Sequence, residues 1–375
     1  MSLIRGLRQR HSAELDFRTE AENLAEVGAN LRSRGFEPAF VRVPTVPDAR
    51  LCTRHVLAME YLHGQSLASA IEDEYAEIAD ALGIGSAAEL RTKLMRRVQA
   101  HFEGGGGAQR FVETAEAAAP LVRAYARLVR WRRSLVASIH GGLAWAAGWL
   151  MLSHLVPPPS ETRVGSTLDR AARSDLGRAI RTLVRVHGVA MLLDGVYNAD
   201  PHPGNVLLLP DGKLGLIDYG MVGRLDPAAR ATVARVVLGL ESGDQASVVG
   251  EYERAGYRAC WHSGERHDAA VVFRFATFHL DRINLAPVAA RPGEPPMPVM
   301  SVLRSTIEHS VPDWVEQARR LGGLLIGVGS QAGRPISLAH EWAPIAREAL
   351  ASAGDEPMAR GATVRLRTHL TGLQL

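Results

Sequence analysis

The sequence has 375 residues, enough for about two domains and a large buried core. Apolar residues make up 46% and charged residues 22%, which is typical of a globular protein and argues against disorder. The net charge of +3 is a small excess of 43 basic over 40 acidic residues, so charge does not favour nucleic acid as a partner. Two of the basic residues, Lys93 and Lys213, are lysines and the rest are arginines, so a mechanism that needs a lysine has two candidates.

The cysteines and the first residues indicate the compartment. Cys52 and Cys260 form no C-x-x-C pair and are too few for a disulfide framework, which favours a reducing environment. The beginning of the sequence is too polar for a signal peptide. We therefore expect a cytoplasmic protein.

An uncharged apolar stretch qualifies that expectation. No Asp, Glu, Lys or Arg occurs at residues 134–160, and three arginines stand at residues 130–133. The stretch is long enough to span a bilayer, but its glycines and histidines disfavour insertion and three prolines end it. It predicts a buried or interfacial helix, with a spanning helix as the alternative, and makes residues 130–156 a candidate contact with a membrane surface.

Periodicity in the first half of the chain predicts mainly helices. Apolar residues at spacings of three and four predict a helix over residues 12–34. Two short strands are expected at residues 41–43 and 56–61, with turn residues between them. Beyond residue 64 the pattern is helical to residue 195, apart from four glycines at 104–107 that predict a flexible connection.

The second half begins with a predicted hairpin. Apolar runs at residues 206–209 and 214–217 flank the turn sequence Pro-Asp-Gly-Lys at 210–213. A helix is expected to start at Asp226-Pro227, and the chain beyond it is predicted to be mostly helical, apart from a proline-rich loop at 287–298.

The residues best suited to chemistry lie just before and just after this hairpin. Asp200 and Asn205 have the spacing of the kinase catalytic loop, in which the aspartate orients a hydroxyl and the asparagine holds a metal. Asp218 follows at the end of the second predicted strand, before Tyr219-Gly220. Two carboxylates and one amide supply hard oxygen ligands for Mg²⁺ and a group near the nucleophile. The alternative is that they are ordinary turn residues beside glycine and proline.

Two strings of residues carry a resemblance to a known family. The strings Ala-Asp-Pro-His-Pro-Gly-Asn at 199–205 and Leu-Ile-Asp-Tyr-Gly-Met-Val-Gly-Arg-Leu at 216–225 resemble segments of the AarF/UbiB family. That family consists of atypical kinase-like proteins associated with quinone synthesis. His202 and Gly220 belong to these motifs. The resemblance implies ATP and Mg²⁺ as cofactors. It implies that Asp200 is the catalytic aspartate and that Asn205 and Asp218 are the metal ligands.

The first part of the chain agrees with the resemblance. Glu14-x-Asp16 resembles the family's Glu-x-Asp motif, and Glu20 stands where the ion-pair glutamate is expected. The second predicted strand and the residues after it resemble the hinge. The resemblance therefore implies that Glu20 pairs with a phosphate-binding lysine and that Glu60 and Tyr61 lie beside the adenine.

The resemblance also implies the fold and its division. We expect an α+β, protein-kinase-like fold with a truncated N-lobe, a helical C-lobe and a helical C-terminal extension. Residues 1–64 would form the partial N-lobe, with an αC-like helix and hinge strands. Residues 65–258 would form the C-lobe, with a helical insertion at about 88–170, and residues 259–375 the extension.

The sequence departs from the family pattern at the nucleotide. No lysine precedes Lys93, and no glycine-rich or alanine-rich loop stands between Met1 and Glu14. Three explanations remain open: the chain starts upstream of Met1, it is a natural pseudokinase, or a partner supplies the missing strands. Whether it is an enzyme stays open, and any phosphotransferase or ATPase activity is expected to be slow or absent. Asn198, where the family often has histidine, is expected to weaken the loop further.

The function expected from the resemblance is an AarF/UbiB-like, Mg-ATP-binding protein linked to isoprenoid-quinone or lipid metabolism, with lipid or quinone-pathway proteins as partners. One alternative is an inactive pseudokinase scaffold. Another is an aminoglycoside-phosphotransferase-like small-molecule kinase, against which the Glu14-x-Asp16 motif argues. A zinc site at Cys260, His262 and His267 is disfavoured because a fourth ligand at suitable spacing is missing.

Overall fold

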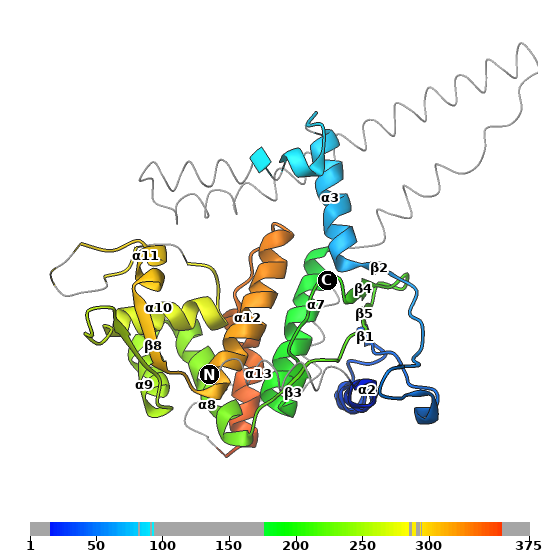
Figure 1. The fold of residues 1–375 in the computed structure, drawn as a ribbon, viewed down its shortest axis with the longest axis horizontal. Helices are drawn as coiled ribbons and strands as arrows, with labels where there is room; N and C mark the ends of the chain where they lie inside the picture. Colours follow the sequence, from blue (N-terminus) through cyan, green and yellow to red (C-terminus); the bar gives the residue numbers. More distant parts are fainter. Residues whose placement is uncertain are drawn as a thin grey trace, which may run out of the picture. The chain divides into compact units, whose positions relative to one another are not determined.

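The computed structural model describes residues 16–81, 83–90, 92–93, 176–284, 287–289, 293 and 295–354. The chain divides into two compact units, one of residues 1–68 and 176–375 and the other of residues 69–175. Helix α3 (Leu67–Ala81) belongs almost entirely to the second unit, and the first unit contains the elements described below (Figure 1). The predicted glycine connection, helical insertion and apolar stretch lie outside the described residues, and the domain boundaries expected from sequence stay a prediction.

Helix α2 (Phe17–Ser33) confirms the first predicted helix within the described residues. Asp16 caps it, because its carboxylate accepts a hydrogen bond from the backbone N–H of Arg18 at 3.1 Å. Leu24, Val27 and Leu31 are at most 2% exposed, so the apolar stripe predicted from spacing is the buried face.

A four-stranded sheet follows the order β1-β5-β4-β2. Its strands are β1 (Val41–Arg42), β5 (Leu214–Leu216), β4 (Val206–Leu208) and β2 (Gln65–Ser66). β4 and β5 form the predicted hairpin, and β1 adds to β5 in parallel. A long-range pairing thus joins the first 70 residues to the hairpin.

The strand predicted at residues 56–61 is wrong. This segment contains no strand, and the chain pairs with β4 later, at β2. The backbone N–H of Glu60 bonds to the carbonyl of Thr45 at 2.8 Å, but no ladder continues from this bond. Val56 and Tyr61 are 54% and 77% exposed, so the alternation of apolar residues does not mark a buried strand face.

A helix and a two-stranded sheet lie next to the loop that contains Asp200. α7 (Leu176–Val189) continues into a π-helical turn (Ala190–Asp194) and ends at Gly195, whose φ of 74° is accessible to glycine without strain. β3 (Val196–Asn198) then pairs antiparallel with β6 (Val222–Arg224). The segment between these strands holds both predicted site loops.

The rest of the first unit is largely helical, as expected from sequence. Asp226 caps α8, accepting from the N–H of Ala229 at 2.8 Å and confirming the predicted start. The sequence did not indicate the two-stranded antiparallel sheet of β7 and β8. The remaining elements are α8 (Pro227–Ser242), α9 (Gln245–Arg254), β7 (Arg258–Trp261), α10 (Ala269–Leu280), α11 (Val299–Arg304), β8 (Thr306–Ser310), α12 (Asp313–Gln331) and α13 (Leu338–Ser352).

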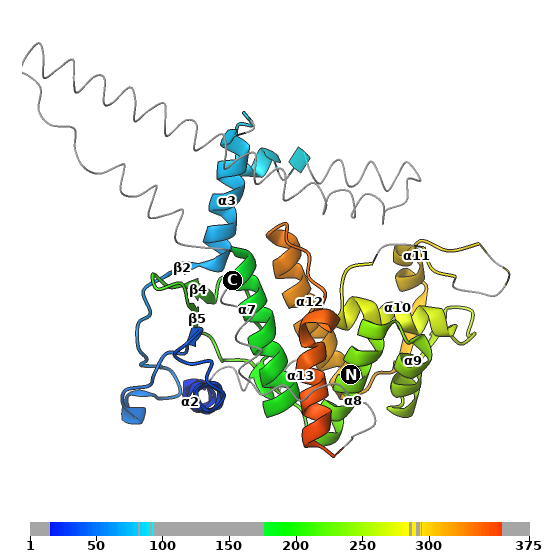
Figure 2. The ribbon, with the colours of Figure 1, turned by 180° about the vertical axis from the view of Figure 1, so that it is seen from behind.

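The centre of this helical body is α13, which packs between α7 and α8 (Figure 2). Trp342 of α13 is fully buried, and its Nε1 donates to the carbonyl of Val184 in α7 at 2.8 Å. Buried indole N–H groups need such a partner, so this bond fixes the register of the two helices.

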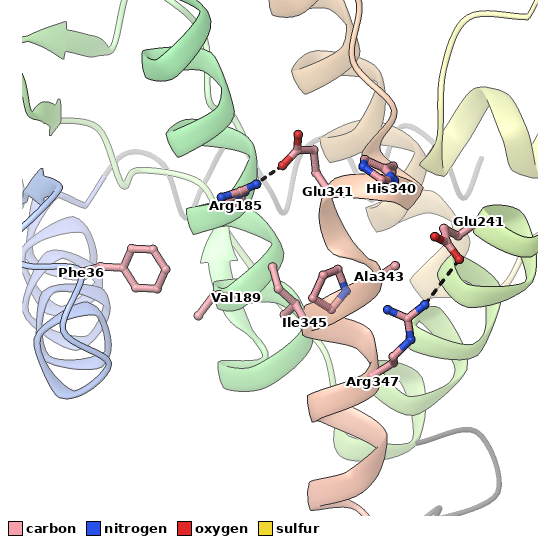
Figure 3. A pocket seen from close by; sticks show the side chains of 10 residues that line it. Phe36, Arg185, Val189, Glu241, His340, Glu341, Ala343, Ile345 and Arg347 are labelled. Carbon is pink, nitrogen blue, oxygen red and sulfur yellow. Dashed lines mark hydrogen bonds and ion pairs between the residues drawn. The ribbon is translucent and has the colours of Figure 1, made fainter. Parts of the chain in front are cut away.

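A cavity of about 260 Å³ lies where α7, α8 and α13 meet residues near Phe36 (Figure 3). Two ion pairs border it: Arg185 with Glu341 at 2.7 Å, and Arg347 with Glu241 at 3.5 Å. They bridge α13 to α7 and to α8. The residues lining the cavity include none of the predicted site residues, so we assign it to helix packing.

Substitutions at the adjacent glycines Gly322 and Gly323 of α12 can test how closely that helix packs on α10. A Cβ at Gly322 would overlap the carbonyl oxygen of His279, whereas a Cβ at Gly323 would have no atom within 4 Å. We expect Gly322→Ala to lower the free energy of unfolding by about 1–3 kcal/mol or more through overpacking. Gly323→Ala should raise it by about 0.5–1 kcal/mol, because alanine favours helix. Urea denaturation of both variants measures this, and equal effects would contradict the described contact.

Candidate functional site

The loop that contains Asp200 is built from consecutive tight turns. The N–H of His202 donates to the carbonyl of Asp200 at 2.7 Å, and the N–H of Asn205 donates to the carbonyl of His202 at 2.8 Å. Pro201 and Pro203 fix φ on both sides of His202, which suits such turns. His202 itself is exposed, and its Nδ1 accepts from the N–H of Gly204 at 3.2 Å.

Two predicted metal ligands lie in direct contact. The side-chain amide of Asn205 donates to Oδ2 of Asp218 at 2.6 Å, and the N–H of Gly220 donates to Oδ1 of the same carboxylate at 3.0 Å. The carbonyl of Asn205 accepts from the N–H of Ile217 at 3.2 Å, so the backbone also joins the loop to the residue that follows β5. Both side chains are half-buried.

Asn198 connects the two predicted carboxylates. Its amide nitrogen donates to the carbonyl of Asp218 at 2.7 Å, and its amide oxygen accepts from the N–H of Asp200 at 2.7 Å. The side chain is buried, at 8% exposure. The sequence suggested that this asparagine weakens the loop, whereas the contacts show it holding both segments. The bond to the N–H of Asp200 is an Asx turn, which the sequence could have indicated. The bond to Asp218 spans 20 positions and depends on the tertiary fold.

Helix α2 reaches the same place through Glu20 and Asn23. Oε1 of Glu20 accepts from the N–H of Tyr219 at 3.3 Å, and the amide of Asn23 donates to the carbonyl of Tyr219 at 2.9 Å. Tyr219 is fully buried, so its peptide groups need these partners. Burial, followed by the charge of Asp218, raises the pKa of the Glu20 carboxyl above its ordinary value.

The ion pairs described for the two lysines are with residues other than Glu20. Nζ of Lys93 lies 2.8 Å from Glu89, one helical turn away, and Nζ of Lys213 lies 2.8 Å from Asp211 in the hairpin turn. In place of a lysine, the structure puts the backbone of Tyr219 and the carboxylate of Asp218 near Glu20.

The predicted adenine contacts have other partners. The carboxylate of Glu60 accepts from Nη2 of Arg42 at 2.6 Å and from the hydroxyl of Thr45 at 3.1 Å. Tyr61 is exposed, and its ring packs edge-on against the ring of His63, with 4.7 Å between the ring centroids. The structure therefore places Glu60 beside β1 and Tyr61 at the surface, and their role toward a nucleotide stays a prediction.

The predicted Glu-x-Asp motif is described only at its second acidic residue, since Glu14 lies outside the described residues. Asp16 caps α2 and pairs with Nη2 of Arg18 at 2.6 Å. This hydrogen bond with Arg18 lowers the pKa of Asp16 to about 2. Asp16 thus has a structural role here whatever its role toward a ligand.

The donors at Asp218 fit Mg²⁺. That ion is usually held by one or two carboxylates together with substrate phosphates, and less often by a cage of protein ligands. The described residues contain no group of three or more His, Cys, Asp or Glu side chains that could hold a metal. The Asp218 carboxylate and the Asn205 amide offer the sparse oxygen set that Mg²⁺ takes.

The link through Asn198 can be tested by stability. Asn198→Ala leaves the carbonyl of Asp218 and the N–H of Asp200 without their described partner. We expect a loss of about 1–3 kcal/mol in the free energy of unfolding, measured by urea denaturation. Asn30→Ala, at a half-buried position of α2, is the control and should be neutral or slightly stabilising. Equal changes in the free energy of unfolding for the two substitutions would contradict the role of Asn198 in linking Asp200 to Asp218.

The raised pKa of Glu20 predicts a pH dependence. The folded state binds this proton more tightly than the unfolded chain, whose ordinary value is 4.5, so stability falls as pH rises from 4.5 through the raised pKa. Glu20→Gln removes the titration and keeps an acceptor for Tyr219. We expect the variant to be more stable than the parent at pH 7, with the difference vanishing below pH 4.5.

Urea denaturation across pH measures this, and Glu22→Gln, at an exposed position of the same helix, controls for the loss of one carboxylate. A Glu20→Gln variant less stable than the parent at pH 7 would contradict the assigned environment.

Comparison with known proteins adds to this geometry. Residues 1–90 and 166–252 match the ABC1 atypical kinase-like domain. The chain is similar to the uncharacterized protein slr0889 of Synechocystis sp., with 37% identity over 100 residues, which are 26% of this chain and 22% of that protein. It is also similar to the chloroplastic protein Activity of BC1 Complex Kinase 3 of Arabidopsis thaliana, with 40% identity over 58 residues, 16% of this chain and 8% of that protein.

A third relative is an uncharacterized chloroplastic aarF domain-containing protein kinase of Arabidopsis thaliana, 37% identical over 62 residues, 16% of this chain and 9% of that protein. These alignments thus span less than a quarter of each relative's length. The solved Rv3197–erythromycin complex from Mycobacterium tuberculosis aligns with a TM-score of 0.46 and 13% identity, over 92% of this chain and 62% of that one.

Among the described helices, none combines the length and hydropathy needed to cross a bilayer, and residues 134–156 lie outside that search. The matched domain includes both the α2 region and the two site loops, which are the segments that carried the sequence resemblance. Over residues 1–90 and 166–252 the match supports an AarF/UbiB-like, ABC1 atypical kinase-like domain, with a kinase-like α+β fold.

Proposed function

We propose that this protein binds Mg-ATP at Asp200, Asn205 and Asp218, as an atypical kinase or ATPase-type protein. The observation that carries the proposal is the 2.6 Å bond between Asn205 and Asp218, which brings the loop and the hairpin end together. Asn198 joins Asp200 to the same cluster. Asp218 follows Asn205 by thirteen positions in sequence, so this grouping depends on the hairpin between them.

Each residue has a separate role in the proposal. The Asp218 carboxylate and the Asn205 side-chain oxygen would hold Mg²⁺, which when bound neutralises charge on the nucleotide phosphates. Asp200 would orient an acceptor hydroxyl or water and take up its proton. Asn198 would act as a positioning residue, because its two bonds fix the backbones of Asp200 and Asp218.

The charge balance around the phosphates favours slow transfer. Kinase-like sites use a lysine to clamp the phosphates and a glutamate to hold that lysine. Here both lysines pair with other residues, while Glu20 adds a second carboxylate near Asp218. A site without that lysine clamp lacks one source of electrostatic stabilisation for transfer. The same observation favours the second candidate function, a nucleotide-responsive scaffold without turnover.

The pathway and location rest on the family alone. We infer a link to isoprenoid-quinone or lipid metabolism, with lipid or pathway proteins as partners and with membrane-surface contact through residues 130–156 of a cytoplasmic protein. Since fold does not determine the reaction, these inferences depend on the family's associations and on no contact described above.

Nucleotide binding can be measured by thermal unfolding with Mg-ATP, Mg²⁺ alone and ATP with chelator. We expect Mg-ATP to raise the unfolding temperature most, because it engages both metal ligands and phosphates. Asp218→Asn should remove that increase. Asp211→Asn, which changes an aspartate in the turn of the same hairpin, should keep it.

The two candidate functions differ in a second readout, phosphate release. Stabilisation together with release that depends on Asp200 would support a weak enzyme. Stabilisation with no release above that of Asp200→Asn would support the scaffold. Absence of any Mg-ATP stabilisation, or an unchanged increase in Asp218→Asn, would overturn the proposed site.

A further inference from the structure

The sheet of β7 and β8 holds a cysteine and a histidine in direct contact. Sγ of Cys260, on β7, lies 3.0 Å from Nε2 of His309, on β8. Neither residue belongs to the segments that match the kinase-like domain, which end at residue 252. The pair is therefore separate from the site proposed for the nucleotide.

An irregularity in the strand pairing distinguishes His309 from its neighbours. Arg258 lies opposite Ser310, whereas the next residue, Ala259, lies opposite Glu308. His309 thus has no partner in the ladder and occupies a β-bulge. Bulges redirect side chains and are common beside functional sites. Here the bulge accompanies the contact between the His309 ring and the sulfur of Cys260.

Solvent reaches this pair from the β8 side. Four of the five residues of β8, His309 among them, are exposed. Cys260 is 8% exposed, and its sulfur is in contact with this exposed imidazole.

Of the neighbouring titratable groups, Glu308 and Nε2 of His267 have partners of their own, whereas Nδ1 of His267 is buried without one. Glu308 accepts from the Tyr257 hydroxyl at 2.9 Å and from Nη1 of Arg319 at 2.9 Å. Nε2 of His267 lies 3.3 Å from the Thr306 hydroxyl, and burial lowers the pKa of this histidine. His309 is thus the group placed to take the proton of the Cys260 thiol.

The second cysteine of the chain, Cys52, allows the surroundings of the Cys260 thiol to be compared within the same protein. It is also 8% exposed, but its Sγ faces the carbonyl oxygen of Ala58 at 3.7 Å. A carbonyl oxygen accepts a hydrogen bond from the protonated thiol and cannot remove its proton. The chain thus contains two thiols of equal exposure, one beside a base and the other beside a neutral acceptor.

We propose that Cys260 is a nucleophilic thiol with His309 as its base, and that it is a site of oxidation by hydroperoxides. His309 takes the thiol proton as the sulfur attacks the peroxide, forming an S–O bond and breaking the O–O bond. The leaving oxygen receives the proton from His309 and departs as water or alcohol. The sulfur is oxidised to a sulfenic acid and the peroxide is reduced.

The test uses the full-length chain and hydrogen peroxide as the probe. After a brief exposure, dimedone traps sulfenic acid, and mass spectrometry quantifies the Cys260 and Cys52 peptides separately. We expect Cys260 to be labelled at least several-fold faster than Cys52. His309→Gln should lower labelling of Cys260 toward that of Cys52 and leave Cys52 unchanged. His262→Gln, an exposed histidine just after β7, is the matched control and should change neither.

If His309 only shielded the sulfur of Cys260 from solvent, removing its ring would speed the labelling of Cys260. His309→Ala opens access to the sulfur while removing the base, so slower labelling supports the proposal, and equal or faster labelling overturns it. Equal labelling of Cys260 and Cys52 in the parent protein would overturn it as well. Iodoacetamide, which needs the thiolate but no oxidant, should show the same order of variants.

Discussion

The hydrogen bonds made at Asp218 and Tyr219 are the constraint on which the candidate site depends. Asn205 and Gly220 bond to the Asp218 carboxylate, and Asn198 bonds to its carbonyl. At the next peptide, α2 contributes Glu20 and Asn23. The loop at residues 198–205 and helix α2 therefore both bond to the segment that contains Asp218 and Tyr219, although the three are remote in sequence. A buried polar network of this kind is stable only when its members are satisfied together, so the site and the packing of α2 are coupled.

Negative charge is the unusual property of this network. Glu20 and Asp218 are near enough that the second raises the pKa of the first, with burial contributing more. In a kinase-like site a lysine would lie between such groups and compensate them. A cation bound at the proposed site would relieve the same repulsion.

Local sequence was sufficient for much of the fold. The helix that became α2, the hairpin of β4 and β5, and the cap at Asp226 were all predicted from spacing, turn residues and capping chemistry. Each depends on residues within a few positions of one another. The strand predicted at 56–61 was wrong because strand formation needs a partner edge, and β2 takes that edge of β4. The pairing of β7 with β8 was missed for the same reason, since their partners are more than 40 residues apart.

The sequence by itself determined which residue types and spacings are present: the Asp200 and Asn205 loop, the aspartate after the hairpin, and the scarcity of lysine. Only the tertiary structure decided what each of them contacts. Asn198 and Asn23 became buried connectors, Glu20 was placed beside a carboxylate, and His309 was brought to Cys260. The physical reason is that hydrogen bonds and charge interactions act over a few ångströms in space, whereas periodicity and capping report only on neighbours along the chain.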